Sequence, residues 1–178
     1  MRWNTIAGAL LCVALAGGCA AQASEGQAGQ PAEAMAAYDK ADVTFSKEMI
    51  VHHRQTLQLA ALVPQRTNTQ YVRDLSQKLE ASEKADIAQM SEWLKSWQVG
   101  VPAQEKEGVA KQVAQLSSKT GAAFDKLWLA TISAHLDHGI MMATAAQSGG
   151  KHGPTIQMAS RLVTEQTDQI AEIREKLA

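Results

Sequence analysis

The sequence predicts an all-α protein built as an antiparallel four-helix bundle, and three patterns support this prediction. Long stretches of the chain are rich in Ala, Leu, Gln, Glu, Lys and Met, which favour helices. Val and Ile never form the alternating runs that a half-buried strand requires. The apolar register also repeats after 83 residues, which indicates two tandem copies of one helical hairpin. Because neither hairpin can bury its apolar stripe alone, we expect the two to dock face to face.

The first 18 residues are typical of an export signal of the lipoprotein type. Arg2 supplies a positive charge, and an apolar run over residues 6–16 leads to small residues before Cys19. This run is too short to span a membrane. Two cleavage sites compete, one that makes Cys19 a lipidated N-terminus and one after Ala23. We favour lipidation of Cys19, which predicts a periplasmic protein held at the outer membrane by lipid alone.

The rest of the chain divides into a tether and one domain. Residues 19–39 are mostly small and polar with little to bury, so they predict a flexible tether. Residues 40–178 predict the bundle, formed by repeats 42–97 and 125–178. The net charge is −1 and the basic residues are scattered among acids, which excludes nucleic acid and an anionic membrane surface as partners. A homo-oligomer is compatible with these patterns.

Helix boundaries follow from capping and breaking residues. Asp42 is expected to cap the first helix, and Pro64 to break it. Gly153 and Pro154 should open the last helix. A weakly amphipathic stretch between the repeats predicts a short crossover helix. The expected helices are 42–63, 70–97, 109–116, 122–147, and one from 153 nearly to the C-terminus.

A polar layer is expected to cross the core. The apolar stripes of the first and third long helices advance in steps of four and three, and these place His52 and His135 at equivalent inward positions. Small residues, Thr56 and Gly139, follow and would leave room beside the imidazoles. Counting back through the loops brings four more polar residues to this level: Glu83, Asp86, Gln166 and Gln169. Because buried polar groups must be paired, this layer requires an explanation.

Two explanations stay open, a structural hydrogen-bonded layer and a metal site. Imidazole and thioether together suit copper, silver or zinc, and the repeated histidines with His53 and His138 beside them favour a metal. His152 in a Gly-rich loop is expected to be solvated, Met141 to be partly exposed, and Trp93 and Trp97 to belong to the core. The candidate ligands are His52, His135, His53, Met49, His138, Asp86, Glu83 and Met142.

One set of residues, spread over both repeats, forms a recognisable family pattern. These residues are Asp42, Phe45, Met49, His52, His53, Leu59, Ala60, Ile87, Met90, Trp93, Leu94 and Trp97, with Phe124, Asp125 and His135 in the second repeat. With this pattern the chain resembles the bacterial family called domain of unknown function 305 over about residues 40–178. The resemblance implies a ferritin-like four-helix bundle, usually exported, with no general enzymatic assignment and with copper or silver binding in some members.

Departures from the family pattern weaken the second half of the site. Leu136 replaces the second histidine of the pair, and His138 stands two residues later. Ile132 takes the place that corresponds to Met49. The family's Gln-x-x-Glu-Ile element has carboxylates in the first repeat, at Glu83 and Asp86, and amides in the second. We therefore expect a single site weighted toward the first hairpin.

The leading hypothesis is an exported, non-enzymatic protein that buffers or sequesters copper or silver, with zinc as a further candidate ion. A metal-free interaction module of the cell envelope is the alternative, in which the polar layer is structural. Di-iron oxidase chemistry requires a Glu-x-x-His motif on each of two helices. No such motif occurs in the sequence, so this class is disfavoured.

Overall fold

The computed structural model describes residues 37–103 and 108–178. All regular secondary structure in these two segments is helical, as predicted. The expected signal, Cys19 and most of the tether lie outside the described residues. Within the described segments, no helix combines the length and hydropathy that crossing a membrane would need.

The four long helices and the short crossover helix are all present. The first helix ends at Ala60 rather than near Val63, because the ring of Pro64 would clash with the Ala60 carbonyl in a continuous helix. A 3₁₀ turn, η1, covers Val63–Gln65 instead. The α-helices are α1 (Lys40–Ala60), α2 (Gln70–Ser96), α3 (Ala110–Ser117), α4 (Gly121–Gly149) and α5 (Gly153–Leu177).

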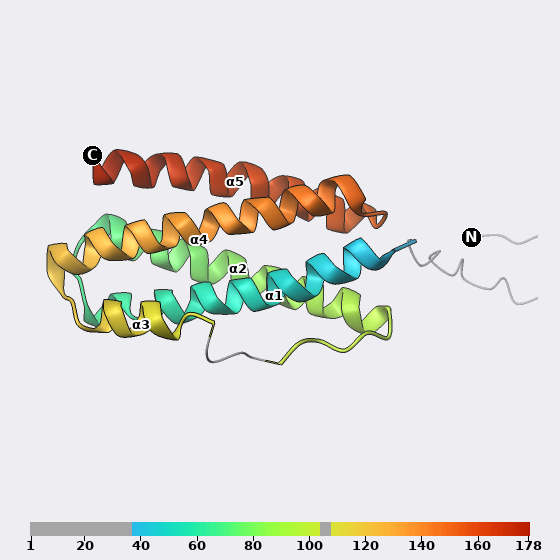
Figure 1. Ribbon diagram of the computed structural model, residues 1–178, viewed down its shortest axis with the longest axis horizontal. Helices are drawn as coiled ribbons and strands as arrows, with labels where there is room; N and C mark the ends of the chain where they lie inside the picture. The colour runs from blue at the N-terminus through green and yellow to red at the C-terminus, as the bar shows by residue number, and fades with distance from the viewer. Residues whose placement is uncertain (1–36, 104–107) are drawn as a thin grey trace, which may run out of the picture. The chain divides into compact units, whose positions relative to one another are not determined.

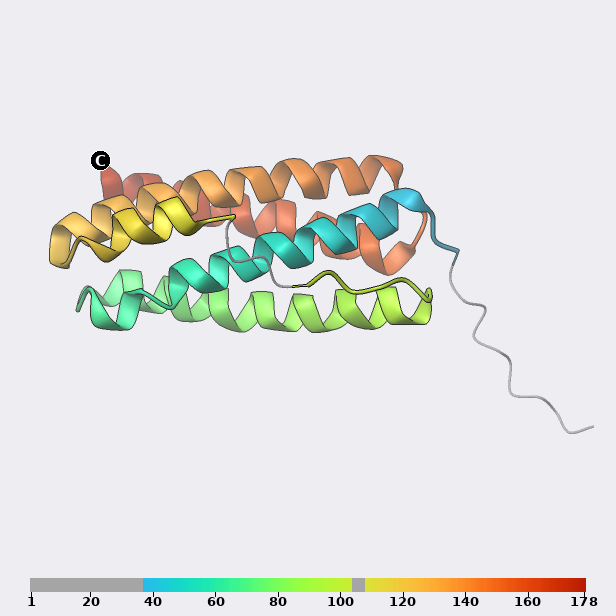
Figure 2. The same ribbon diagram turned by 60° about the horizontal axis from the view of Figure 1, so that its bottom comes forward.

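Two antiparallel hairpins make up the bundle (Figure 1). Helix α1 pairs with α2, α4 pairs with α5, and the hairpins meet mainly along α1 and α4. Residues 97–103 after α2 run back along the bundle, and α3 packs against α1 and α4 (Figure 2). The Arg54 guanidinium donates to the Pro102 carbonyl at 2.6 Å and fixes this return segment beside α1.

The apolar core consists of two clusters, and the predicted polar layer lies between them. One cluster contains Leu59, Leu79, Trp128 and Ile132 among others. The other contains Phe45, Met49, Ile50, Met90, Leu94 and Leu162 among others. Along each long helix the two clusters are separated by the polar residues or by Gly139. The buried polar side chains between them are His52, His53, Thr56, Glu83, Asp86, Gln166 and Gln169.

Asp42 is not the helix cap that the sequence predicted. Asp39 is the N-cap of α1, and Asp42 sits three residues later as the second member of a capping box. One Asp42 oxygen accepts from the backbone N–H groups of Asp39, Lys151 and His152 at 2.9, 3.0 and 3.1 Å. The buried carboxylate therefore joins the start of α1 to the α4–α5 loop.

His152 is buried, contrary to the expectation that it is solvated. It is the N-cap of α5, and its Nδ1 accepts from the Thr155 backbone N–H at 3.3 Å. Its ring meets Trp93 and Trp97 edge-on, with centroids 5.2 and 5.0 Å apart. A capping histidine between two indoles explains the burial, which a Gly-rich loop does not suggest from sequence. Trp97 is buried and Trp93 half-buried, close to the prediction.

Replacing Asp42 by Asn should lower the free energy of unfolding by about 1–2 kcal/mol, because one oxygen would still accept but without its charge. Asp125→Asn is the matched control. Asp125 occupies the corresponding position of α4, where it accepts one exposed hydrogen bond from the Thr69 hydroxyl at 2.5 Å. Urea unfolding of the two variants checks this. An equal loss of unfolding free energy in both would contradict the inference that Asp42 stabilises the fold by joining α1 to the α4–α5 loop.

Candidate functional site

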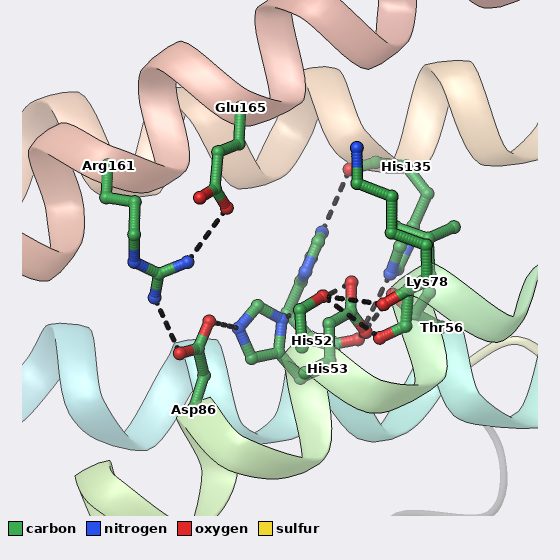
Figure 3. Close-up of polar contacts among 11 residues, drawn as sticks. His52, His53, Thr56, Lys78, Asp86, His135, Arg161 and Glu165 are labelled. Carbon is green, nitrogen blue, oxygen red and sulfur yellow. Dashed lines mark hydrogen bonds and ion pairs between the residues drawn. The ribbon is translucent and has the colours of Figure 1, made fainter. Parts of the chain in front are cut away.

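The centre of the polar layer is a stacked pair of histidines from α1 and α4. The rings of His52 and His135 lie 9° from parallel with centroids 3.8 Å apart. Nε2 of His52 donates to the His135 carbonyl at 2.9 Å, and Nε2 of His135 donates to the His52 carbonyl at 3.1 Å (Figure 3). Because a carbonyl only accepts, each ring carries its proton on Nε2 and a lone pair on Nδ1.

This reciprocal bonding joins positions 83 residues apart in both directions. It is the geometry that an approximate twofold axis between the hairpins would produce. The sequence offset of 83 thus coincides with a structural correspondence at these two residues, while the duplication of the whole hairpin stays a prediction.

Burial keeps both rings neutral. It lowers the pKa of His52 to about 2, with the neighbouring His135 and His53 rings adding to the effect. The pKa of His135 is also lowered, chiefly by burial. A neutral imidazole with a free lone pair is the form that binds a metal ion. His52 therefore needs no proton loss to act as a ligand.

A second constellation lies between α1 and α2, around the fully buried His53. Its Nδ1 is 3.7 Å from a Glu83 oxygen, and its Nε2 is 3.6 Å from an Asp86 oxygen. Asp86 also pairs with Arg161 at 2.6 Å, and Arg161 pairs with Glu165 at 2.8 Å on the surface of α5 (Figure 3). The two carboxylates face opposite edges of the ring, so one ion cannot take His53 and both of them in this arrangement.

The pKa values of the two carboxyl groups in this constellation are shifted in opposite directions. Burial raises the pKa of Glu83 to about 7, and the His53 ring and Thr56 hydroxyl oppose only part of that rise. Burial would also raise the pKa of Asp86, but His53 and Arg161 more than offset it and lower that pKa below its usual value. Asp86 is therefore an anion at neutral pH, whereas Glu83 titrates near it.

Many side-chain nitrogen and oxygen atoms of the layer lack a hydrogen bond of ordinary length and angle. Among the described residues, twelve buried side-chain nitrogens and oxygens are in this condition, and eight of them belong to the layer. Native proteins leave few such atoms, and an ion or a buried water commonly satisfies them. The eight atoms are His52 Nδ1, both ring nitrogens of His53, both carboxylate oxygens of Glu83, Asp86 Oδ2, Gln166 Oε1 and Gln169 Oε1.

Gly139 leaves the room beside the imidazole that the sequence predicted, and the His52 ring and the Gln166 amide fill it. A Cβ there would stand 3.0 Å from Cε1 of His52 and 2.6 Å from Oε1 of Gln166. A larger residue at this position would require the imidazole and the amide to shift. The unpartnered Gln166 oxygen consequently lies on the same side of the layer as the His52 ring.

A groove on the outer side of α1 and α4 holds two of the three remaining predicted ligands. His138 and Met142 line two adjoining parts of it, and His52 lines one of them. His138 is exposed, with its ring centroid 5.6 Å from that of His52. Met141, expected to be partly exposed, has 65% of its surface open to solvent in the same groove.

The eight predicted ligands therefore do not form one preassembled site. His52 and His135 stack, His53 contacts Glu83 and Asp86, and His138 and Met142 line the groove. Met49 packs in the apolar cluster with Met90. No three His, Cys, Asp or Glu side chains within residues 37–103 and 108–178 converge on a position that could hold an ion.

Sequence reasoning missed Arg161, whose charge holds Asp86 ionised. Its pairing with Glu165 follows the i, i+4 spacing of a helix and was open to prediction. Its contact with Asp86 joins residues 75 positions apart on different hairpins, so local spacing carries no signal for it.

The family model of a domain of unknown function, DUF305, matches residues 42–177. This chain belongs to the DUF305 family. The match covers nearly the whole bundle and confirms the resemblance seen in the sequence. No curated protein matched the DUF305 chain.

Solved structures show the same fold as this DUF305 protein. A DUF305 protein from Streptomyces coelicolor is 21% identical with a TM-score of 0.72, covering 77% of this chain and 90% of its own. A DUF305 fragment from Deinococcus radiodurans is 22% identical with a TM-score of 0.70, covering 78% and 96%. CopM in its Cu(II)-bound form is 17% identical with a TM-score of 0.68, covering 76% and 95%. At these identities the likeness establishes the helical bundle alone.

Proposed function

We propose that this DUF305 protein is an exported, non-enzymatic metal-binding protein that holds copper, or a similar soft or borderline ion, at the polar layer. The observation that carries this proposal is the gathering, at one level of the core, of eight buried side-chain nitrogen and oxygen atoms that lack a hydrogen bond of ordinary length and angle. Imidazole nitrogen suits copper and zinc, and the layer offers it together with carboxylate and amide oxygens. An ion would supply a closer partner than the contacts of 3.6 and 3.7 Å that four of these atoms make with one another.

The first hairpin supplies both carboxylates of the layer and the His52 ring. His52 presents a neutral ring with Nδ1 free, and Glu83 and Asp86 lie on α2. The second hairpin adds His135 and the amides of Gln166 and Gln169. Because no three His, Cys, Asp or Glu side chains converge in the described structure, binding is expected to draw side chains together around His52.

One comparison supports copper as the ion, and another supports export of the protein. CopM, which shares the fold, is described in a Cu(II)-bound form. The Streptomyces coelicolor relative is described as a candidate secreted protein. The first 18 residues of this chain have the pattern of an export signal, and Cys19 stands where a lipid would be attached. A lipid-anchored buffer for copper or silver in the periplasm accords with both.

A metal-free envelope module is the second candidate, and one set of contacts favours it. The reciprocal bonds between His52 and His135, with the Asp86–Arg161 pair, already satisfy part of the layer. A layer of this kind could fix the register between the hairpins without any ion.

Thermal unfolding with and without ions separates the two candidates. Cu(II) and Zn(II) are added separately to the mature protein, with a chelator as reference. A bound ion should stabilise the fold by about 2.7 kcal/mol at a hundred times its dissociation constant. His52→Ala should remove most of that stabilisation, and His135→Ala should remove part of it.

His152→Asn is the matched control, because asparagine keeps a capping oxygen at a histidine position outside the layer. Its ion-induced stabilisation should equal that of the wild type. If the ion raises the melting temperature of wild type, His52→Ala and His135→Ala equally, these histidines do not bind it. If no ion changes any melting curve specifically, the structural layer is the correct interpretation.

A further inference from the structure

The solvent-facing groove between α1 and α4 contains a donor set that is chemically different from the buried layer. His138, Met141 and Met142 line it from α4, and Glu48 lines it from α1. Residues at positions i, i+3 and i+4 lie on one side of a helix with Cβ atoms about 5–6 Å apart. One imidazole and two thioethers therefore face the same stretch of groove.

The exposure of Met141 requires an explanation. With 65% of its surface open, it is one of two large apolar side chains that are exposed in the described structure. It contributes little to packing, and it adjoins the half-buried Met142 and the exposed His138. A thioether at an open position next to an imidazole is available to bind an ion without any rearrangement of the core.

The ligand chemistry selects a class of ion. Thioether sulfur is a soft donor that prefers Cu(I) and, by the same softness, Ag(I) over divalent ions. It has no proton to lose, so it binds without the deprotonation that other ligands require. The buried layer offers only nitrogen and oxygen atoms, which suit borderline divalent ions better.

We propose that His138, Met141 and Met142 form a surface site for a soft monovalent ion, Cu(I) or Ag(I), separate from the buried layer. The site does not depend on ion binding by the layer. It adjoins that layer nonetheless, because His138 and Met142 also line the part of the groove that reaches His52. The ring centroids of His138 and His52 are 5.6 Å apart.

Titration of the mature protein with Ag(I) in chloride-free buffer tests the site. Silver is the probe because it keeps one oxidation state in water. With the methionine methyl groups labelled by carbon-13, the signals of Met141 and Met142 should shift on addition of Ag(I), and that of Met158 should not. Met158 is the control because it lies on α5, against a different part of the surface.

Variants then measure what the thioethers contribute. Met141→Leu combined with Met142→Leu should weaken Ag(I) binding by at least about tenfold, since leucine preserves volume but has no donor atom. The melting temperature without ion should be unchanged, because Met141 is exposed and Met142 half-buried. Met158→Leu should bind Ag(I) as the wild type does.

Failure of this site can be told from failure of the buried one. The double Leu variant should keep the stabilisation by Cu(II) or Zn(II) that depends on His52, and His52→Ala should keep Ag(I) binding in the groove. An unchanged Ag(I) affinity in the double Leu variant overturns the proposal. So does an Ag(I) titration in which the Met141 and Met142 methyl signals stay in place.

Discussion

Lowering the pH should unfold the metal-free protein largely through His52. The ring is buried and accepts a proton in the folded state only with difficulty, because burial lowers its pKa to about 2. In the unfolded chain the same ring has its ordinary pKa of about 6.5. Its contribution to stability is therefore complete above about pH 6.5 and declines as the pH falls below that value. At about pH 4 the loss is on the order of 3 kcal/mol from this residue.

Other titrating groups also change how the free energy of unfolding depends on pH. The pKa values of His135 and His152 are also lowered by burial, so both histidines add to the acid-induced loss. The pKa of Asp86 is lowered by its contacts with His53 and Arg161, and this adds a further loss near and below its ordinary value. Glu83 opposes them, since its pKa is raised and protonation favours the folded state.

Urea unfolding of wild type and His52→Gln across this pH range measures the effect. Glutamine keeps a donor for the His135 carbonyl but does not titrate. The difference in stability between about pH 7 and about pH 4 should be smaller in His52→Gln by roughly 3 kcal/mol. Parallel pH profiles for wild type and His52→Gln would contradict the assignment.

The fold was predictable because its signals are periodic and local. Each long helix contains an apolar stripe and ends at a recognisable breaker, and the breaks at Pro64 and Gly153 lie within a few residues of the predicted positions. The repeat offset placed His52 and His135 at one level, and the structure stacks them there. The sequence also predicted that Gly139 leaves room for an imidazole beside it.

The site was less predictable because its contacts join residues far apart in sequence. Helical spacing places His52 and His53 on different sides of α1, but it does not say which partner each one meets. His53 faces the carboxylates of α2, and His52 faces α4. The direction of the α4–α5 loop decides that His152 is buried between two indoles, and a run of glycines carries no information about that direction.

Glu83→Gln should make the metal-free protein more stable at about pH 8, by on the order of 1–3 kcal/mol. The Glu83 carboxyl is almost fully buried, and burial raises its pKa to about 7 from an ordinary value near 4.5. The folded state therefore binds this proton more tightly than the unfolded chain, so the contribution is complete below about pH 4.5 and is lost as the pH rises through about 7. Glutamine removes that loss, and the second hairpin already has a buried amide, Gln166, at the corresponding position.

Urea unfolding at about pH 5 and pH 8 measures this effect. The free energy of unfolding of Glu83→Gln should exceed that of the wild type at pH 8, and the difference should shrink on acidification. Gln166→Glu, the mirror-image control, should destabilise the protein most at the higher pH, and a Glu83→Gln profile parallel to the wild type would exclude Glu83 as the titrating group.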